Sequence, residues 1–300
     1  MTRRRWHGLL AAALLVAGCS EGYRAERMFW RAQHDHAAVL KDPTKATPQQ
    51  VAAAVHSFEE ISHKTPGTPW AARSQMMIGT LYLGQKDYDK ARESFGLVLQ
   101  NYNRYQDLAL RARVAIAKSF EVQGKWEDAV RVYKDVSEYH PWSRLGLEAP
   151  LYIGAMYEQR KEKTHAMDAY ERAVHIYTRM VPDSPTPEMA MQVRGYLTLA
   201  YQRLGEWDKA IALLEELAKA ETGGVNRPLV LLTLGSIYDS KLSNKDKAAE
   251  VYGRLIHDFP ENPLGKVARE QRKKLGFPDD PSEAGKPALP QATPSSTGAR

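Results

Sequence analysis

A spacing of small and aromatic residues recurs along most of this 300-residue chain. A small residue is followed by an aromatic one three positions later, then by alanine after nine positions and a bulky residue after four. The copies are Gly79, Tyr82, Ala91 and Phe95; Ala117, Phe120, Ala129 and Tyr133; Gly154, Tyr157, Ala166 and Tyr170; Thr198, Tyr201, Ala210 and Leu214; and Gly235, Tyr238, Ala248 and Tyr252, whose middle step is one residue longer. An early partial copy contains Ala54, Phe58 and Ile61. The chain is therefore a tandem array of repeats.

Each copy of the pattern predicts two helices packed as a hairpin. Residues three or four positions apart share one helical face, so small residues let two helices approach while aromatic side chains fill the space beside them. Gly124 and Gly205 precede acidic residues, which is typical of one helix ending and the next beginning. Pro66, Pro141 and Pro260 mark the ends of second helices, because proline cannot continue the backbone hydrogen bonding.

The small and aromatic positions, together with the terminal prolines, resemble the tetratricopeptide repeat. The resemblance covers residues 25–276 and implies an all-α right-handed superhelix of about six helix hairpins. A final helix over 263–275, carrying Lys266, Arg269, Arg272, Lys273 and Lys274, is expected to form a polar cap, with a basic docking patch as the alternative. Residues 277–300 are rich in proline, serine and glycine and are expected to be a disordered tail.

The step between hairpins is longest near the middle of the chain. From Ala166 to Ala210 it is 44 residues, against 37 from Ala129 to Ala166. We therefore expect residues 182–187, which contain three prolines, to form an exposed loop.

The N-terminus carries the chain's single cysteine, Cys19. Arg3–Arg5 and the short apolar run Leu9–Val16 are typical of a cleaved signal peptide over residues 1–18, since the run is too short to span a bilayer. Twin-arginine export is a weaker alternative. Val16-Ala17-Gly18-Cys19 resembles the lipobox of bacterial lipoproteins, which implies cleavage before Cys19 and attachment of acyl chains, palmitate among them, to that residue. One thiol cannot form an intrachain disulfide, and a metal site needs more ligands.

A lipidated Cys19 would hold the array close to a membrane. Residues 19–24 are expected to be a short tether, spanning about 3.5 Å per residue when extended. By resemblance to lipoprotein sorting, Ser20 indicates the periplasmic face of the outer membrane. A short tether favours a subunit of a membrane-bound complex.

Charge and motifs argue against other classes of function. The formal net charge of +6 falls to about +3 without the signal peptide, and basic residues are not clustered, so no nucleic-acid partner is expected. No phosphate-binding glycine loop, zinc-protease motif or nucleophile elbow is present. The pairs His34 and His36, and His56 and His63, fall short of a metal site. We therefore expect that the protein is not an enzyme, that it has no small-molecule substrate, and that it carries no cofactor other than the lipid.

Protein binding is the remaining function. In the resembling family, the first helices of successive hairpins form a concave wall that holds peptides or partner subunits. Counting from the small–aromatic pairs, the residues expected to face that wall are Arg73, Met76, Thr80, Arg111, Lys118, Glu121, Glu158, Gln202, Arg203 and Asp239.

The lipidated cysteine, short tether and about six repeats together resemble the tetratricopeptide lipoprotein of the outer-membrane β-barrel assembly machine. The resemblance implies binding to the barrel-forming core subunit. The same architecture suits a pilotin for a type IV pilus or secretion secretin, or a scaffold for polysaccharide export. An enzyme on a helical scaffold is the alternative from a different class.

Overall fold

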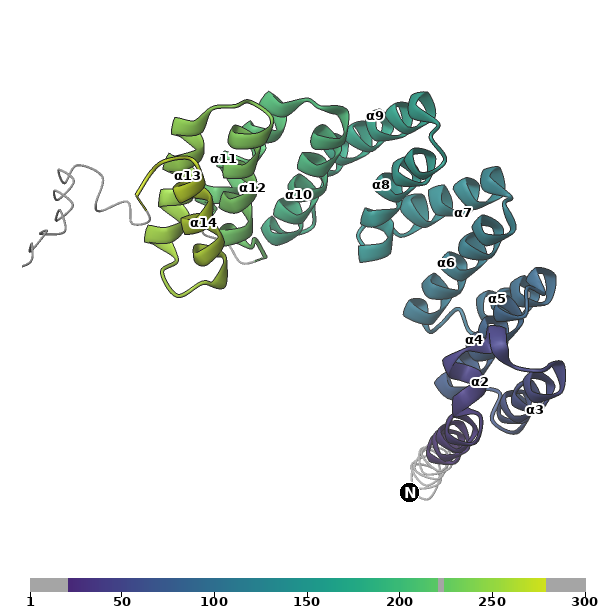
Figure 1. Cartoon of the computed structure of the whole chain (residues 1–300). Helices are drawn as coiled ribbons and strands as arrows, with labels where there is room; N and C mark the ends of the chain where they lie inside the picture. Colours follow the sequence, from purple (N-terminus) through teal and green to yellow (C-terminus); the bar gives the residue numbers. More distant parts are fainter. Residues whose placement is uncertain (1–20, 221–223, 279–300) are drawn as a thin grey trace, which may run out of the picture. The chain divides into compact units, whose positions relative to one another are not determined.

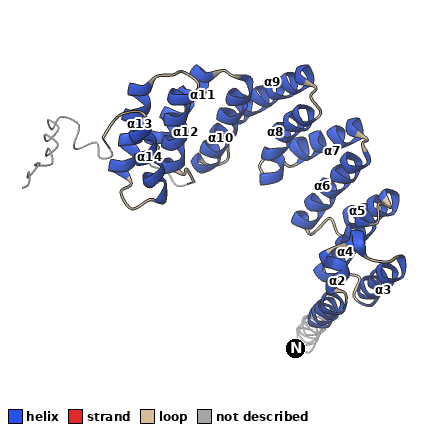
Figure 2. Cartoon of the chain, in the orientation of Figure 1, coloured by secondary structure: helices blue, strands red, loops and turns tan. Residues whose placement is uncertain are grey.

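The computed structural model describes residues 21–220 and 224–278. Within these two ranges every regular element is a helix (Figure 2). The predicted all-α class of tandem helix hairpins is therefore confirmed. The predicted signal peptide, Cys19 and the tail from residue 279 onward lie outside the described residues.

Successive helices pair as antiparallel neighbours along the chain (Figure 1). The first hairpin combines the helical residues 21–35, α2 (Ala37–Lys41), the short 3-10 turn η1 (Pro43–Lys45) and α3 (Pro48–Lys64). The next five hairpins are α4 (Pro69–Gly84) with α5 (Tyr88–Asn101), α6 (Gln106–Gln123) with α7 (Trp126–Tyr139), α8 (Arg144–Gln159) with α9 (Lys163–Met180), α10 (Pro187–Leu204) with α11 (Trp207–Lys219), and α12 (Arg227–Ser240) with α13 (Lys245–Asp258). A last helix, α14 (Pro263–Lys274), packs on α12 and α13.

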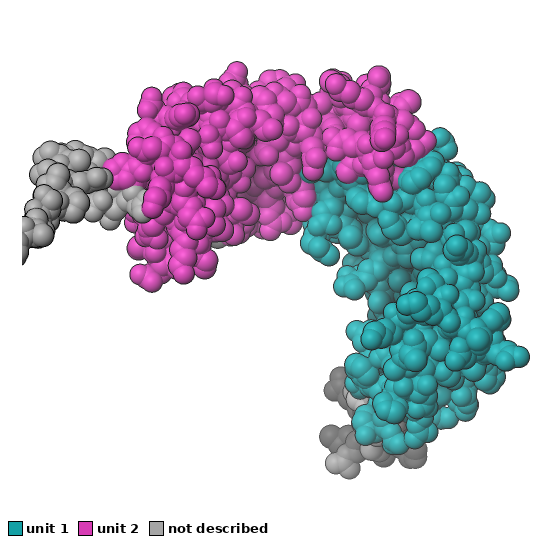
Figure 3. Space-filling model, viewed as in Figure 1, with its two compact units in different colours: residues 1–153 teal, residues 154–300 magenta. Residues whose placement is uncertain are grey.

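The chain divides into two compact units, residues 1–153 and 154–300 (Figure 3). Unit 1 holds the first three hairpins and the first part of α8, and unit 2 holds the rest. Each unit has its own buried apolar cores, centred in unit 1 on residues such as Phe58 and Phe95 and in unit 2 on residues such as Leu234 and Tyr252.

Helix ends follow local sequence signals. The side-chain oxygen of Thr47 accepts a hydrogen bond from the Gln50 backbone N–H (3.3 Å), and Gln50 Oε1 accepts one from the Thr47 N–H (2.9 Å), which forms a capping box at the start of α3. Gly124 and Gly205 end α6 and α10 with φ angles of 79° and 76°, a left-handed conformation that glycine adopts without steric cost. The predicted glycine stops are therefore present.

The small–aromatic pattern marks the seam inside each hairpin. A Cβ atom added to Gly79 would overlap the ring of Phe95, and one added to Gly154 would overlap the ring of Tyr170. Gly235 has the same relation to Tyr252. The first helix of a hairpin therefore approaches the second closely enough that an aromatic ring occupies the space a side chain would need.

Two details differ from the sequence-based expectations. Residues 21–24, expected to belong to an extended tether, are helical. Arg272, expected on the polar outer face of the last helix, is only 4% exposed, because its guanidinium donates to the carbonyls of Ala249 and Pro278 and lies beside the Phe277 ring. The segment between α9 and α10 contains no helix, as the prolines predicted.

Candidate functional site

The predicted contact residues fall into two groups, one in each unit. Unit 1 contains Arg73, Met76, Thr80, Arg111, Lys118 and Glu121. Unit 2 contains Glu158, Gln202, Arg203 and Asp239.

A groove of about 450 Å³ lies in unit 1, between the first helices of three successive hairpins, α4, α6 and α8. We call it the unit 1 groove. The residues that line it are Thr80, Leu83, Phe95, Arg111, Val114, Ala115, Lys118, Tyr133, Leu145, Glu148, Ala149 and Tyr152. Three of the predicted contact residues, Thr80, Arg111 and Lys118, are therefore brought together here.

The groove has an apolar floor and a charged rim. Leu83, Val114 and Leu145 each leave part of their surface uncovered within it. On the rim, Arg111 Nε pairs with Asp107 at 2.9 Å and Glu148 pairs with Arg144 at 3.4 Å. Three of these side chains are largely exposed, and that of Glu148 is 41% exposed. Exposed pairs of this kind contribute little to stability and can exchange partners. The groove can therefore enclose an apolar side chain while its rim meets charges of either sign.

A hydrogen-bonded cluster around Glu121 supports one end of the groove. The Glu121 carboxylate accepts hydrogen bonds from Lys118 Nζ at 2.7 Å, from the Tyr152 hydroxyl at 2.9 Å and from the Tyr133 hydroxyl at 3.2 Å. The rings of Tyr133 and Tyr152 pack edge to face with their centroids 5.0 Å apart. A buried carboxylate with three donors is satisfied, so the cluster fixes the two tyrosines that form this part of the wall.

The cluster also shifts the protonation equilibria of its members. Burial raises the pKa of Tyr133, and the neighbouring Tyr152 and Glu121 raise it further. Partial burial acts to lower the pKa of Lys118, but its hydrogen bonds to Glu121 and Tyr152 outweigh that effect and raise it. Lys118 therefore stays charged and Tyr133 stays neutral at neutral pH.

Three predicted contact residues of unit 1 have other positions. Glu121 is 8% exposed and lies beneath the groove surface, where it positions Lys118 and Tyr152. The Arg73 guanidinium stacks over the Trp70 ring at 4.6 Å, and Met76 packs against the apolar core between α4, α5 and α6. Neither Arg73 nor Met76 lines the groove.

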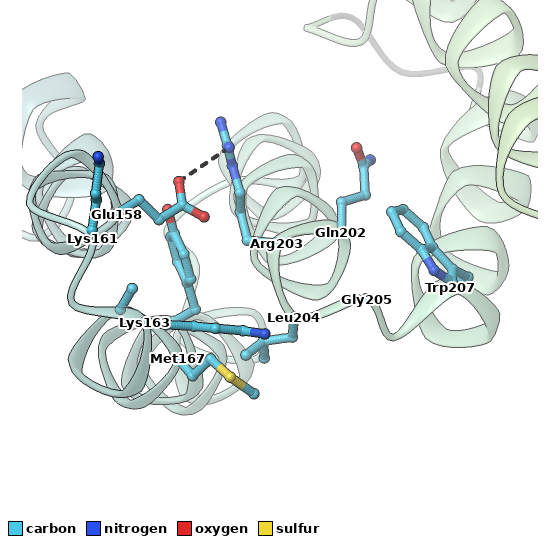
Figure 4. A pocket seen from close by; sticks show the side chains of 11 residues that line it. Glu158, Lys161, Lys163, Met167, Gln202, Arg203, Leu204, Gly205 and Trp207 are labelled. Carbon is cyan, nitrogen blue, oxygen red and sulfur yellow. Dashed lines mark hydrogen bonds and ion pairs between the residues drawn. The ribbon is translucent and has the colours of Figure 1, made fainter.

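A second pocket, of about 590 Å³, lies in unit 2 (Figure 4). We call it the unit 2 pocket. It is lined by Glu158, Lys161, Lys163, Ala166, Met167, Tyr170, Gln202, Arg203, Leu204, Gly205 and Trp207, which come from α8 to α11 and the turns between them. Three of the predicted contact residues of this unit, Glu158, Gln202 and Arg203, thus share one pocket.

Four charged side chains, Glu158, Lys161, Lys163 and Arg203, line part of the unit 2 pocket. Arg203 Nη1 lies 3.4 Å from the Glu158 carboxylate, and both side chains are substantially exposed. A dashed line marks this pair in Figure 4. The Tyr170 hydroxyl beneath them is buried and makes no hydrogen bond of acceptable geometry with the described residues. Burial raises the pKa of Tyr170, and the nearby Glu158 carboxylate raises it further. Two lysines and an arginine around one carboxylate suit this pocket to an acidic group.

Asp239 does not line either cavity. It lies half-buried on α12, where its negative charge adds to the effect of burial in raising the pKa of Tyr252. Burial is the main reason that the pKa of Tyr252 rises to about 12, with Asp239 as the second cause.

Sequence reasoning missed several groove residues, and the repeat register could have identified some of them. Glu148 lies six positions before Gly154, the same offset that placed Arg111 before Ala117. Leu83 lies four positions after Gly79, just as Glu121 lies four positions after Ala117. Tyr152 carries no such signal, because its role depends on the position of Glu121 in the preceding hairpin.

Neither metal-binding clusters nor membrane-spanning helices are found in the part of the chain that the structure describes. No group of three or more His, Cys, Asp or Glu side chains in residues 21–220 and 224–278 could hold a metal ion. In the same residues, no helix is both long and apolar enough to cross a bilayer.

Models of known families match most of the chain. A tetratricopeptide repeat-like domain matches residues 3–191, and two tetratricopeptide repeats match residues 197–226 and 229–262. No curated protein matches the sequence.

Solved structures with the same kind of fold are distant in sequence. A thermophilic tetratricopeptide repeat protein from Thermus thermophilus is 20% identical over 68% of this chain and 98% of its own, with a TM-score of 0.40. A tetratricopeptide repeat protein from Parabacteroides merdae is 15% identical over 83% of this chain and 99% of its own, with a TM-score of 0.35. YrrB, described as having an unusual peptide-binding site, is 15% identical over 72% of this chain and 99% of its own, with a TM-score of 0.36.

Proposed function

This chain belongs to the tetratricopeptide repeat family, whose domains are protein-interaction modules, and we propose that it holds a segment of a partner protein in the unit 1 groove. The observation that carries the proposal is the apolar floor of that groove, which is open to solvent between three first helices. Filling it with one leucine-sized side chain would bury apolar surface worth about 1.5–3 kcal/mol. The charged rim would add specificity and speed of association more than affinity.

The proposed scaffold is anchored to a membrane through acyl chains on Cys19. The support is the Val16–Cys19 stretch behind a basic and apolar N-terminus, and Ser20 favours the periplasmic face of the outer membrane. Two or more acyl chains on one residue suffice for stable anchoring, whereas a single chain does not. The proposal includes no catalytic step and no cofactor beyond this lipid.

Among complexes of the outer membrane, the β-barrel assembly machine is the proposed partner. The support is the combination of a lipobox, a short connection to the array and six hairpins. A pilotin acting on a secretin and a scaffold for polysaccharide export share that combination and are distinguished by the partner recovered.

Purification of the tagged lipoprotein from mildly solubilised membranes tests the partner, with mass spectrometry as the readout. Ala115→Glu places a carboxylate on the groove floor, and Ala212→Glu places one on the exposed surface of α11 as a matched control. We expect the barrel-assembly core subunit with the wild type and with Ala212→Glu, and its loss with Ala115→Glu, provided that circular dichroism shows both variants folded.

Two results would contradict the proposal in different ways. Undiminished recovery of the partner with Ala115→Glu would exclude the groove as the contact surface. A secretin or an export component in place of the barrel-assembly core would keep the scaffold and change the complex to one of the alternatives.

The anchor is tested separately by Cys19→Ser. The variant is expected to leave the outer-membrane fraction and to lose incorporation of labelled palmitate. A processed Cys19→Ser protein that remains in that fraction after a high-salt wash, which weakens electrostatic contacts with lipid headgroups, would refute lipid anchoring.

A further inference from the structure

The first described helix presents a stripe of aromatic and cationic side chains on its exposed face. The stripe consists of Tyr23, Arg24, Arg27, Trp30 and Arg31. We propose that this N-terminal stripe lies on a bilayer surface that contains anionic headgroups, and so forms a second membrane contact beside the lipid on Cys19. The inference deepens the proposed function and rests on its membrane anchor.

The two faces of this helix are sharply different. Ala25, Phe29 and Ala32 are buried, and the Phe29 ring packs against Phe58 at 5.7 Å and Trp70 at 5.2 Å between centroids. On the other face, Tyr23 is 63% exposed and Trp30 is 56% exposed. Because the buried face is fixed to α3 and α4, the stripe is held outward in one orientation.

The arc of this helix that holds the stripe contains no carboxylate. At about 100° per residue, the stripe and His34 fall within about 120° of the helix circumference. The acidic residues Glu21, Glu26 and Asp35 lie outside this arc, and Asp35 Oδ1 is 3.3 Å from His34 Nδ1.

The cations of the stripe are available for a ligand. Among the residues that the structure describes, Arg24, Arg27 and Arg31 form no ion pair, and the Arg27 guanidinium lies over the Tyr23 ring at 5.8 Å. Three arginines without carboxylate partners match an anionic surface in charge.

A bilayer is the occupant that the chain's own geometry favours. Tyr23 follows Cys19 by four residues, a span of at most about 14 Å, so an acylated Cys19 would bring the stripe to the headgroups. Tryptophan and tyrosine concentrate at the membrane–water interface, and each arginine near an anionic leaflet adds about a fivefold gain in binding. The stripe would therefore orient the first hairpin on the membrane.

Binding to lipid vesicles tests the stripe without the acyl chains. The protein is the processed chain from residue 19 with Cys19→Ser, which retains every described residue. The vesicles are phosphatidylcholine alone or phosphatidylcholine mixed with phosphatidylglycerol, and binding is measured by co-sedimentation. The stripe variants are Arg24→Gln/Arg27→Gln/Arg31→Gln and Tyr23→Ala/Trp30→Ala. The matched control, Arg131→Gln/Lys134→Gln/Tyr139→Ala, removes two cations and a 65% exposed tyrosine from α7.

We expect the unlipidated chain and the α7 control to bind the anionic vesicles, and to bind less as salt is added. Each arginine replaced should weaken binding about fivefold. Brominated lipid should quench the tryptophan fluorescence of the wild type more than that of Trp30→Phe. The inference is overturned if the wild type does not bind anionic vesicles, or if the stripe variants bind as the control does.

Failure of the stripe and failure of the anchor give different results. Loss of vesicle binding would leave lipidation of Cys19 intact, whereas a failed Cys19→Ser fractionation would leave the stripe's affinity for vesicles unchanged.

Discussion

Glu121 in unit 1 and Glu158 in unit 2 occupy the same position of the repeat, four residues after the small residue of the first helix. The Glu121 side chain is 8% exposed and has three donors, whereas the Glu158 side chain is 43% exposed and pairs across the pocket with Arg203. One repeat position thus supports the wall of an apolar groove in one unit and the charged lining of a pocket in the other.

The difference comes from the following hairpin. Tyr152, two residues before Gly154, donates to Glu121, but Tyr196, two residues before Thr198, stacks on Tyr177 with the ring centroids 5.8 Å apart. This change coincides with a longer step between small residues, 37 positions from Ala117 to Gly154 and 44 from Gly154 to Thr198. The extra residues lengthen α9 to 18 residues, against 14 in α7, and form the proline-containing loop before α10. Spacing between hairpins therefore decides which side chains meet at a repeat position.

The largest expected effect tests whether the units share the same hairpin seam. Gly79→Ala in unit 1 and Gly235→Ala in unit 2 should each lower the free energy of unfolding by about 3 kcal/mol, because the new methyl group overlaps an aromatic ring. Urea denaturation followed by circular dichroism measures the loss. Gly96→Ala in α5, where nothing lies within 4 Å of the added atom, is the control and should be neutral or stabilising. A loss of stability from only one of the two glycine substitutions would mean that the units do not share the same hairpin seam.

The next effect tests the two carboxylates directly. Glu121→Ala should lower the free energy of unfolding by about 2 kcal/mol, because it leaves the buried Tyr133 hydroxyl without its acceptor. Glu158→Ala should cost less than about 0.5 kcal/mol, because its pair with Arg203 is exposed. Urea midpoints of the two variants measure the difference, and equal losses would mean that the two sites differ less than their geometry indicates.

The third prediction concerns the stability of unit 2 at alkaline pH. The pKa of Tyr252 is raised from 10.0 to about 12, so the folded state keeps the proton that the unfolded state loses. The stabilising contribution is complete below the unfolded pKa and is lost as pH rises toward about 12, amounting to about 1.4 kcal/mol of lost stability by pH ~11. Tyr252→Phe should remove that part of the decline in urea midpoints measured between pH ~9 and ~11. An unchanged decline would show that burial of this hydroxyl does not set the pH dependence.

The smallest effect concerns the hydroxyls of two equivalent tyrosines. Tyr133→Phe should cost about 1 kcal/mol, because Glu121 loses a donor, whereas Tyr170→Phe should be neutral or slightly stabilising, because its hydroxyl is buried without a hydrogen bond to the described residues. Thermal melting of both variants measures the contrast. Destabilisation by Tyr170→Phe equal to that by Tyr133→Phe would mean that Glu158 accepts a hydrogen bond from Tyr170 in solution.

The hairpins could be predicted from the sequence because their signals are local. Each signal depends only on residues of a single hairpin. These signals are the small–aromatic steps, the glycine stops at Gly124 and Gly205, and the prolines after second helices. Counting along one helix likewise selected Arg111 and Lys118, which line the unit 1 groove.

The composition of the sites was harder to predict because it depends on neighbouring hairpins. Glu121 was expected at the surface, and its burial follows from Tyr152, which lies 31 residues later. Met76 was expected to face the concave wall, but it packs, partly buried, against the apolar core between α4, α5 and α6. Counting positions along one helix does not show which side chain of the next hairpin will contact a given residue.

The most direct test of the groove is site-specific photo-crosslinking in living cells. A photoreactive residue at position 115, on the groove floor, is compared with one at Lys134 on the exposed surface of α7. We predict a crosslink to the barrel-assembly core subunit from position 115 and none from position 134. The absence of a crosslink from position 115, or equal crosslinks from both positions, would contradict this prediction.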